Sequence, residues 1–330
     1  MANNTSDQSE NVAVVEGEDS IALAESRSAE LNAHASKINK QDKFATAILY
    51  LFVGIVLLIL AFIIIYILYE GLPTALDIEF LTNSATDSEN PGIGTCLFDS
   101  FYILILTLLI SVPISLFGAI YLVEYAPDNW FTHMASTAIE TLSSLPSIVV
   151  GMFGSLLFVT TFGWGLSVLA GAVTLTMFNI PILVRVIQQA LEDVPQSQRD
   201  AALAMGLTKW ETTIHVLIPY AMPAIITGIV MSAGRVFGEA AALIFTAGSA
   251  SVNLNFSSTD LSSPRNPWNI FRPAETLAVH IYKLKMEPSA GNDELVWGSA
   301  CVLLICVLLF NIAARIIGNL LTRRMTKEKA

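Results

Sequence analysis

The sequence predicts an all-α, polytopic membrane protein with six transmembrane helices. Of its 330 residues, 54% are hydrophobic and only 14% are charged, whereas a soluble domain carries about 25% charged residues. A hydrocarbon core of about 30 Å requires about 20 apolar residues of helix. Six stretches meet this requirement, at about 44–69, 97–125, 136–160, 166–189, 221–246 and 297–321.

The region before the first span predicts a disordered tail. Residues 1–36 contain seven acidic residues, one basic residue (Arg27) and few large apolar side chains. Such a composition buries too little apolar surface to offset the entropy lost on ordering. We therefore expect residues 1–43 to form a disordered, acidic cytoplasmic tail. The first span is too long for a signal peptide and lacks a small-residue cleavage site, so we expect it to be retained.

Basic residues near the ends of the spans predict the orientation. Lysines precede the first span between residues 37 and 43, and a basic tail, 322–330, follows the last span. The loop between the first two spans contains no Lys or Arg. Both termini and the segment 190–219 are therefore expected in the cytoplasm, and the loop 247–296 outside. That outer loop carries four basic residues, but long loops follow the charge rule weakly.

The segment 190–219 is the least apolar region between two strongly apolar spans. Pro195 interrupts the helix that leaves the membrane, because proline has no backbone N–H to donate. A short helix is expected to follow and to end at Gly206, since glycine readily adopts the positive φ found where helices end. A second short helix is expected over 209–217. Taken alone, this pattern is also typical of an ordinary helical loop.

The spacing within this segment resembles the EAA motif of ABC-importer permeases. In that motif Glu-Ala-Ala is followed by three residues, Gly, nine residues and Ile-x-Leu-Pro. Here Asp200, Ala201 and Ala202 come first, Gly206 holds the glycine position and Pro219 ends the motif, with Val-Leu-Ile before it. The resemblance implies the type I ABC-importer permease fold. It also implies a coupling helix that docks into a groove of a cytoplasmic ATPase.

No catalytic or metal-binding constellation is visible along the chain. There is no G-x-x-x-x-G-K-[ST] phosphate cradle, so the chain is expected to be a non-catalytic permease whose partner ATPase binds ATP and Mg. Cys96, Cys301 and Cys306 support no disulfide framework and are expected to be small apolar fillers. No His, Cys and carboxylate residues have metal-ligand spacing. A second Glu-Ala-Ala, at 239–241, lacks the motif's Gly and Pro and lies in a span, so it is not a coupling site.

The fifth span carries two charged residues in an apolar sequence. Arg235 lies near its middle and Glu239 follows four residues later, on the same face of a continuous helix. An arginine in mid-bilayer costs about 2.5–3.5 kcal/mol on insertion scales, which favours a functional role. One interpretation is an anion path, because guanidinium presents paired donors that match the oxygens of phosphate or sulphate. The alternative is a self-neutralising ion pair that fixes helix packing.

In the anion-path interpretation, Glu239 holds Arg235 between transport events and accepts a hydrogen bond from a protonated oxyanion. Phosphate near neutral pH carries such a proton and sulphate does not, so this hypothesis favours phosphate. Gly234 and Gly238 form a G-x-x-x-G pattern in the same span. Small residues at this spacing predict close helix packing, within the chain or between permease subunits.

Other polar positions carry less information. Ser143, Ser144, Pro146, Asn179 and Pro181 interrupt apolar helices, and two interpretations stay open for them: they line a cavity, or they bond between helices. Asp99, Glu124 and Glu140 lie near span ends, where we expect contact with water. His280 belongs to an amphipathic stretch expected at the membrane surface or against a binding protein, with no role as ligand or base.

Four stretches together resemble the PstA-type permease of the bacterial phosphate ABC importer: "GRVFGEAAALIFTAG", "LSSLPSIVVGMFG", "LEDVPQSQRDAALAMG" and "PAETLAVHIYKLKMEP". The similarity extends over about 44–321. It implies ATP-driven import of inorganic phosphate by an assembly with a homologous second permease subunit, two ATP-binding cassette ATPase subunits and an extracytoplasmic phosphate-binding protein. It also implies a prokaryotic cytoplasmic membrane. Lipid is the only further partner expected, and nucleic acid is not.

Two alternatives remain open from the sequence. A permease for sulphate or another oxyanion differs only in substrate and uses the same coupling segment. A self-contained secondary transporter or anion channel belongs to a different class, and it predicts internal inverted repeats or a pore formed by this chain alone. That second alternative leaves the motif at 200–219 unexplained.

Overall fold

A computed structural model describes residues 42–43, 45–87, 90–287 and 292–327. These residues form helices and connecting segments without a β-strand, so the predicted all-α class is confirmed. The acidic tail expected over 1–43 lies almost entirely outside the described residues. The chain divides into two units, Met1–Tyr66 and Ile67–Ala330, which are described separately.

The first unit contains most of the helix Ala45–Ala75, which continues into the second unit. Its side chains are apolar over the whole circumference, and large ones such as Leu58 and Phe62 are exposed. A helix that is apolar on every side requires either a protein core or a lipid environment. With 31 residues, this helix is long enough to cross the hydrocarbon core of a bilayer.

The second unit begins with the end of that helix and contains α-helices joined by short π-helical turns. In chain order they are α2 (Ile78–Thr82), α3 (Gly94–Ile120), η1 (Tyr121–Tyr125), α4 (Trp130–Ser143), α5 (Ser147–Gly154), η2 (Ser155–Thr161), α6 (Val168–Glu192), α7 (Gln196–Ala204), α8 (Lys209–Thr212), η3 (Thr213–Leu217), α9 (Ile218–Phe237), α10 (Ala241–Thr246), α11 (Leu277–Met286) and α12 (Asn292–Lys327).

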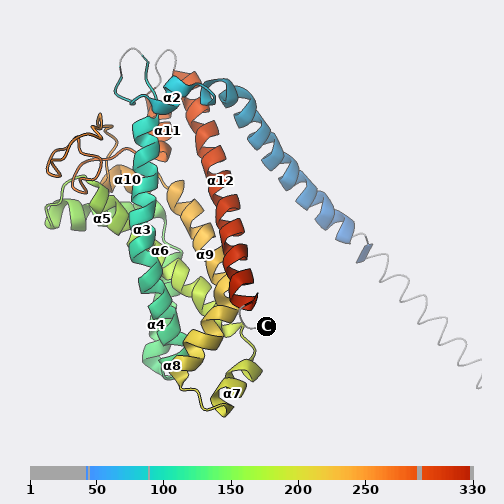
Figure 1. The fold of residues 1–330 in the computed structure, drawn as a ribbon. Helices are drawn as coiled ribbons and strands as arrows, with labels where there is room; N and C mark the ends of the chain where they lie inside the picture. Colours follow the sequence, from blue (N-terminus) through green and yellow to red (C-terminus); the bar gives the residue numbers. More distant parts are fainter. Residues whose placement is uncertain (1–41, 44, 88–89, 288–291, 328–330) are drawn as a thin grey trace, which may run out of the picture. The chain divides into compact units, whose positions relative to one another are not determined.

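The helix α6 is at the centre of the second unit. It packs against α3, α4, α5, α9 and α10, and α9 packs in turn against α12 (Figure 1). One apolar cluster, around Leu175 and Leu243, joins α3, α6, α9 and α10. Another, around Ile187 and Leu217, joins the later halves of α3 and α6 to η3 and α9. A third, around Phe80 and Leu277, joins α2, α11 and the first part of α12 to α3.

Five helices among the described residues are long and apolar enough to cross a membrane, and there are six spans if one bent pair counts as a span. The five are Ala45–Ala75, Gly94–Tyr125, Val168–Glu192, Lys209–Phe237 and Asn292–Ala313. The arrangement agrees with the predicted number of spans. The third and fifth predicted spans, however, differ from the helices in the structure.

The third predicted span, 136–160, is not one straight helix. It consists of α4 and of α5 with η2, and the two parts meet at 101°. Pro146 stands at the bend with extended backbone angles, φ −61° and ψ 133°. A proline lacks the N–H that would continue the helix, and it disfavours helical angles in the residue before it. The serines beside it bond to their own turn, since Ser143 and Ser144 donate to the carbonyls of Glu140 and Thr141.

The fifth predicted span, 221–246, begins earlier and ends earlier than expected. The helix runs without interruption over Lys209–Phe237, so it continues directly from the segment expected in the cytoplasm. It stops at Gly238, and α10 follows as a separate short helix. The side chain of Glu239 accepts a hydrogen bond from the N–H of Ala242 at 3.2 Å. This bond satisfies one N–H in the first turn of α10.

Candidate functional site

The helices α7 and α8 form a compact unit with its own capping interactions. Pro195 precedes α7, and Gly206 follows it with φ +87°, as the sequence predicts. The N–H of Leu207 donates to the carbonyl of Ala202 at 3.2 Å across this glycine turn. Thr208 and Glu211 then form a capping box, in which each side chain accepts the other's backbone N–H. The capping box was not predicted, although the T-x-x-E spacing in the sequence indicates it.

One arginine attaches α7 to the membrane helices. Arg199 forms an ion pair with Glu124 in η1, and its other terminal nitrogen donates to the carbonyl of Leu191 at 2.7 Å. The Arg199 and Glu124 side chains are only 15% and 12% exposed, so Glu124 is mostly covered by this pair. By contrast, Glu140 is exposed and pairs with Arg185 at 2.6 Å. The position of α7 is therefore fixed relative to the ends of α3 and α6.

Three of the five residues of the predicted motif are exposed on this anchored unit. Asp200, Ala201 and Gly206 are exposed, whereas Ala202 is buried against the bundle and Pro219 is half-buried in the first turn of α9. Large apolar side chains are exposed close to them. These are Leu203 (46%), Met205 (80%) and Trp210 (48%). Exposed apolar groups among polar residues are typical of a protein–protein contact. We call Asp200, Ala201, Leu203, Met205, Gly206 and Trp210 the α7–α8 surface.

Arg235 and Glu239 do not form the predicted pair. No ion pair within 4.0 Å joins them among the described residues. The helix ends at Phe237, so the i+4 relation of a continuous helix does not apply, and Glu239 caps α10 instead. Arg235 lies in the last turn of α9 and not in the middle of a span. A cation in the last turn of a helix interacts favourably with the helix dipole.

The side chain of Arg235 is exposed and stacks on an aromatic ring of α6. Its guanidinium carbon lies 4.2 Å from the centroid of Phe178. Stacking on a ring face orients the guanidinium plane and leaves its N–H donors directed outward in that plane. Phe178 also lines an apolar hollow of about 270 Å³ between α4, α5 and α6, at the bend around Pro146. Arg235 is thus held against α6, on a ring that also lines this hollow.

The two glycines near Arg235 do not make close helix contacts with any part of the chain that the structure describes. A Cβ on Gly234 would come no nearer than 3.6 Å to Asn311, and a Cβ on Gly238 would meet only its own helix. Close contacts occur at other glycines. A Cβ on Gly228 would lie 2.3 Å from a methyl of Val186, and a Cβ on Gly151 would lie 2.6 Å from the Cα of Ala242. Contact between permease subunits through Gly234 and Gly238 stays a prediction.

Asn179 bonds between helices. Its amide donates to Ser111 in α3 at 3.0 Å, and its oxygen accepts from Ser232 in α9. All three side chains are buried. For Asn179 the structure therefore favours interhelical hydrogen bonding over the lining of a cavity, the alternative left open by the sequence.

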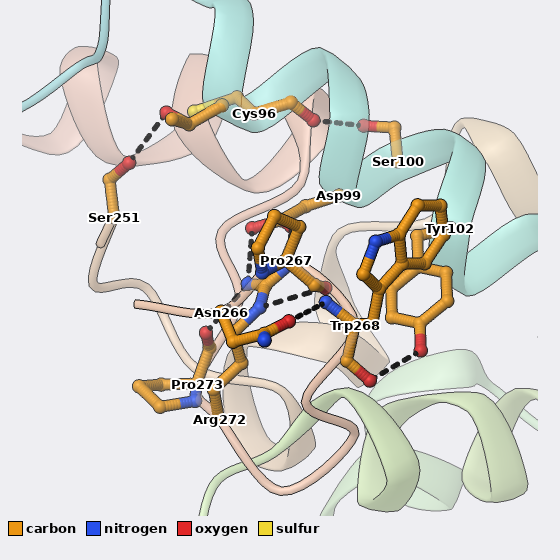
Figure 2. Close-up of polar contacts among 11 residues, drawn as sticks. Cys96, Asp99, Ser100, Tyr102, Ser251, Asn266, Pro267, Trp268, Arg272 and Pro273 are labelled. Carbon is orange, nitrogen blue, oxygen red and sulfur yellow. Dashed lines mark hydrogen bonds and ion pairs between the residues drawn. The ribbon is translucent and has the colours of Figure 1, made fainter. Parts of the chain in front are cut away.

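A buried ion pair fixes the long connection between α10 and α11 onto α3. Arg272 is 1% and Asp99 2% exposed, so the expected contact of Asp99 with water is wrong. The guanidinium makes two bonds to the Asp99 carboxylate, at 2.5 and 3.2 Å, and its remaining bonds go to the carbonyls of Pro267 and Pro273 (Figure 2). Tyr102 donates to the carbonyl of Trp268 at 3.1 Å. Arg272 is therefore a buried structural residue. It is not one of the surface charges by which membrane orientation is predicted.

The stretch around His280 is buried in its first half and partly exposed in its second. The first turn of α11 is buried from Leu277 to His280, and the helix packs against α12 and α3. His280 Nδ1 lies 3.0 Å from a carboxylate oxygen of the fully buried Glu275. Sequence spacing did not indicate this contact or the nearby sulfur of Cys96. The three residues come from segments about 180 residues apart and meet only in the folded chain.

Comparison with known proteins identifies the family. Residues 111–327, about two thirds of the chain, match the model of the binding-protein-dependent transport system inner membrane component. The probable ABC transporter permease protein YqgI of Bacillus subtilis is 46% identical over 86% of this chain and 97% of its own length. The phosphate transport system permease protein PstA of Haemophilus influenzae is 31% identical over 83% and 93%. PstA of Yersinia pestis is 33% identical over 68% and 72%.

Two solved structures share the fold at low sequence identity. A bacterial alginate ABC transporter, in complex with its alginate-bound periplasmic protein, aligns with a TM-score of 0.53 and 13% identity over 84% of this chain and 96% of that chain. The inward-facing MetNI methionine ABC transporter aligns with a TM-score of 0.50 and 18% identity over 71% and 94%. The predicted type I ABC-importer permease fold is confirmed. The chain belongs to the binding-protein-dependent transport system inner membrane components, the permease subunits of ABC importers.

Proposed function

We propose that the chain is the transmembrane subunit of an ATP-driven importer that moves inorganic phosphate into the cell. The observation that carries the coupling part of this proposal is the α7–α8 surface, an anchored, capped unit that exposes apolar side chains at the position of the EAA motif. Partner ATPase subunits would bind ATP and Mg and dock on this surface. Because Arg199 attaches α7 to the ends of α3 and α6, movement of the docked partner would reach the membrane helices.

The identity of the substrate rests on different support. Arg235 presents an exposed guanidinium, oriented by Phe178, a ring that also lines the hollow at the broken span. A planar guanidinium with parallel N–H donors matches the oxygens of phosphate and sulphate equally in geometry. The PstA relatives, which are named as phosphate permeases and are 31–33% identical, favour phosphate. Sulphate or another oxyanion is the second candidate, because Arg235 alone does not distinguish the two.

The proposed assembly contains a homologous second permease, two ATP-binding cassette ATPase subunits and an extracytoplasmic phosphate-binding protein. In it, both termini and the α7–α8 surface face the cytoplasm of a prokaryotic cell, and the connection between α10 and α11 faces outward. Each permease would contribute one substrate-facing cation, and in this chain that cation is Arg235. A self-contained secondary carrier is less well supported, because it gives the α7–α8 surface no role.

Replacing Gly206 tests the docking surface. Gly206→Val should reduce co-purification with the candidate ATPase and ATP-driven uptake severalfold, because a β-branched residue at φ +87° is strained by more than about 1–2 kcal/mol and would redirect the chain between α7 and α8. Membrane insertion, measured as the amount of chain in washed membranes, should not change.

Gly206→Asn is the matched control. Asparagine tolerates the left-handed conformation, and no described residue lies within 4 Å of a Cβ at this position, so assembly should be largely retained. Normal assembly and coupled uptake in Gly206→Val would contradict the docking assignment.

A further inference from the structure

A cluster of three metal-ligating side chains lies next to the Asp99–Arg272 pair. Cys96 in the first turn of α3, Glu275 before α11 and His280 within α11 place one sulfur, one carboxylate oxygen and one ring nitrogen within 4.8 Å of one another. The exposed fractions are 0%, 0% and 7%. We propose that these three residues bind a divalent metal ion, with zinc as the best match to the ligand set.

The ligand types and their number support this assignment. Zinc binds thiolate, imidazole and carboxylate groups, and a site with three protein ligands leaves a fourth tetrahedral position for water. From usual zinc–ligand distances, ligand atoms around one tetrahedral zinc lie about 3.5 Å apart. The observed separations of up to 4.8 Å require closure by about 1 Å, which side-chain rotation supplies. Hard cations such as calcium and magnesium prefer all-oxygen sites and fit the sulfur of Cys96 poorly.

The carboxylate of Glu275 gives an independent reason to expect a ligand. One of its oxygens, Oε2, is buried and has no hydrogen-bond partner among the residues that the structure describes, and Oε1 lies 3.0 Å from His280 Nδ1. The ammonium nitrogen of Lys283, Nζ, lies 3.6 Å from Oε2, beyond hydrogen-bond distance. A buried charged oxygen without a hydrogen bond is costly. A metal ion at this carboxylate would compensate for that missing bond.

The charges around the cluster are compatible with a divalent cation. The acids Asp99 and Glu275 are balanced by Arg272 and Lys283, so a thiolate formed at Cys96 would add an uncompensated negative charge. A divalent ion supplies the opposite charge. Lys283 is 37% exposed and donates to the carbonyl of Ser249 at 3.0 Å, so its ammonium group can leave Glu275 without losing all contacts.

Hydrogen bonds through Ser100 already connect the two segments that carry the three ligands. Ser100 accepts a hydrogen bond from the N–H of Leu277 at 2.8 Å and donates to the carbonyl of Cys96 at 2.7 Å, which Figure 2 shows in part. A bound metal would therefore add a direct link between α3 and α11 at a point where these two helices are already in contact. This site is distinct from the α7–α8 surface and from Arg235, and it does not depend on the proposed substrate.

Cobalt titration of the full-length chain tests the site. The chain, purified in detergent and treated with a chelator, should bind one Co²⁺ that produces a thiolate-to-cobalt charge-transfer band, and Zn²⁺ should displace it. Cys96→Ser should abolish the band. Glu275→Gln and His280→Gln should each weaken binding by about 100-fold or more, beyond the usual loss for residues that only support a ligand.

Cys306→Ser is the matched control and should keep the band, because Cys306 is a half-buried thiol of α12 outside the cluster. A band that is absent from the wild-type chain, or that survives Cys96→Ser, would overturn the proposal. X-ray absorption on the wild-type zinc form provides a test that requires no variant. One sulfur among nitrogen and oxygen neighbours supports the site, and a metal environment without sulfur overturns it.

Discussion

Arg272→Met should lower the free energy of unfolding by about 3–5 kcal/mol, the usual cost of removing one partner of a buried ion pair. The substitution leaves the Asp99 carboxylate, 2% exposed, without its two hydrogen bonds from the guanidinium. The carbonyls of Pro267 and Pro273 lose donors as well. The change is measured as the shift in the unfolding midpoint of the purified chain in a denaturant or thermal titration.

The double variant Arg272→Met with Asp99→Leu separates charge from packing. Replacing a whole buried pair by apolar residues of similar volume is often neutral or stabilising, so the double variant should recover at least half of the loss. Tyr102→Phe, which removes only the bond to the carbonyl of Trp268, should cost about 0.5–1.5 kcal/mol. An Arg272→Met variant within about 1 kcal/mol of the wild type would contradict a structural role for the pair.

Arg235→Ala should reduce ATP-driven phosphate uptake by about 100-fold or more while the complex still assembles. Two charge-assisted hydrogen bonds at about 1.5–3 kcal/mol each account for at least this factor. The loss in stability should be small, because an exposed cation–π contact is worth only about 0.5–1 kcal/mol. Labelled phosphate uptake into proteoliposomes and co-purification of the subunits measure the two effects separately.

Arg235→Lys and Arg185→Gln are the controls for this result. Lysine keeps the charge but loses the planar fork of donors, so Arg235→Lys should retain an intermediate rate. Arg185 is also an exposed arginine, but its surface ion pair with Glu140 is worth at most about 1 kcal/mol. Its replacement should leave uptake within severalfold of the wild type. Wild-type uptake by Arg235→Ala would remove Arg235 from the substrate path.

Features with a local cause were predictable from the sequence. The apolar stretches gave the spans because hydrocarbon thickness sets their length. Gly206 has the positive φ expected of a glycine that ends a helix, and Pro195 precedes α7 as expected. The bend at Pro146 has a local cause too, but a proline can also be accommodated within a span, as Pro113 and Pro181 are here. Proline alone therefore did not distinguish a bend from a continuous helix.

Features that depend on distant parts of the chain were not predictable. Arg199 and Glu124 are 75 residues apart, and Arg272 and Asp99 are 173 apart, so no spacing rule connects them. The expected Arg235–Glu239 pair failed for a different reason. The rule for residues four apart assumes a continuous helix, and the helix ends between them at Gly238. Glu239 directly follows Gly238, and the sequence alone does not show whether the helix continues through this glycine or ends at it.

Labelled phosphate uptake with and without ATP hydrolysis tests the central claim most directly. The chain is reconstituted with its candidate second permease, ATPase and binding protein, and unlabelled sulphate is added as competitor. We predict uptake that requires hydrolysis and that excess sulphate does not suppress. Phosphate flux without ATP, or through this chain alone, would indicate a secondary carrier. Hydrolysis-driven uptake of sulphate in preference to phosphate would indicate a permease for another oxyanion. Either result would contradict the account.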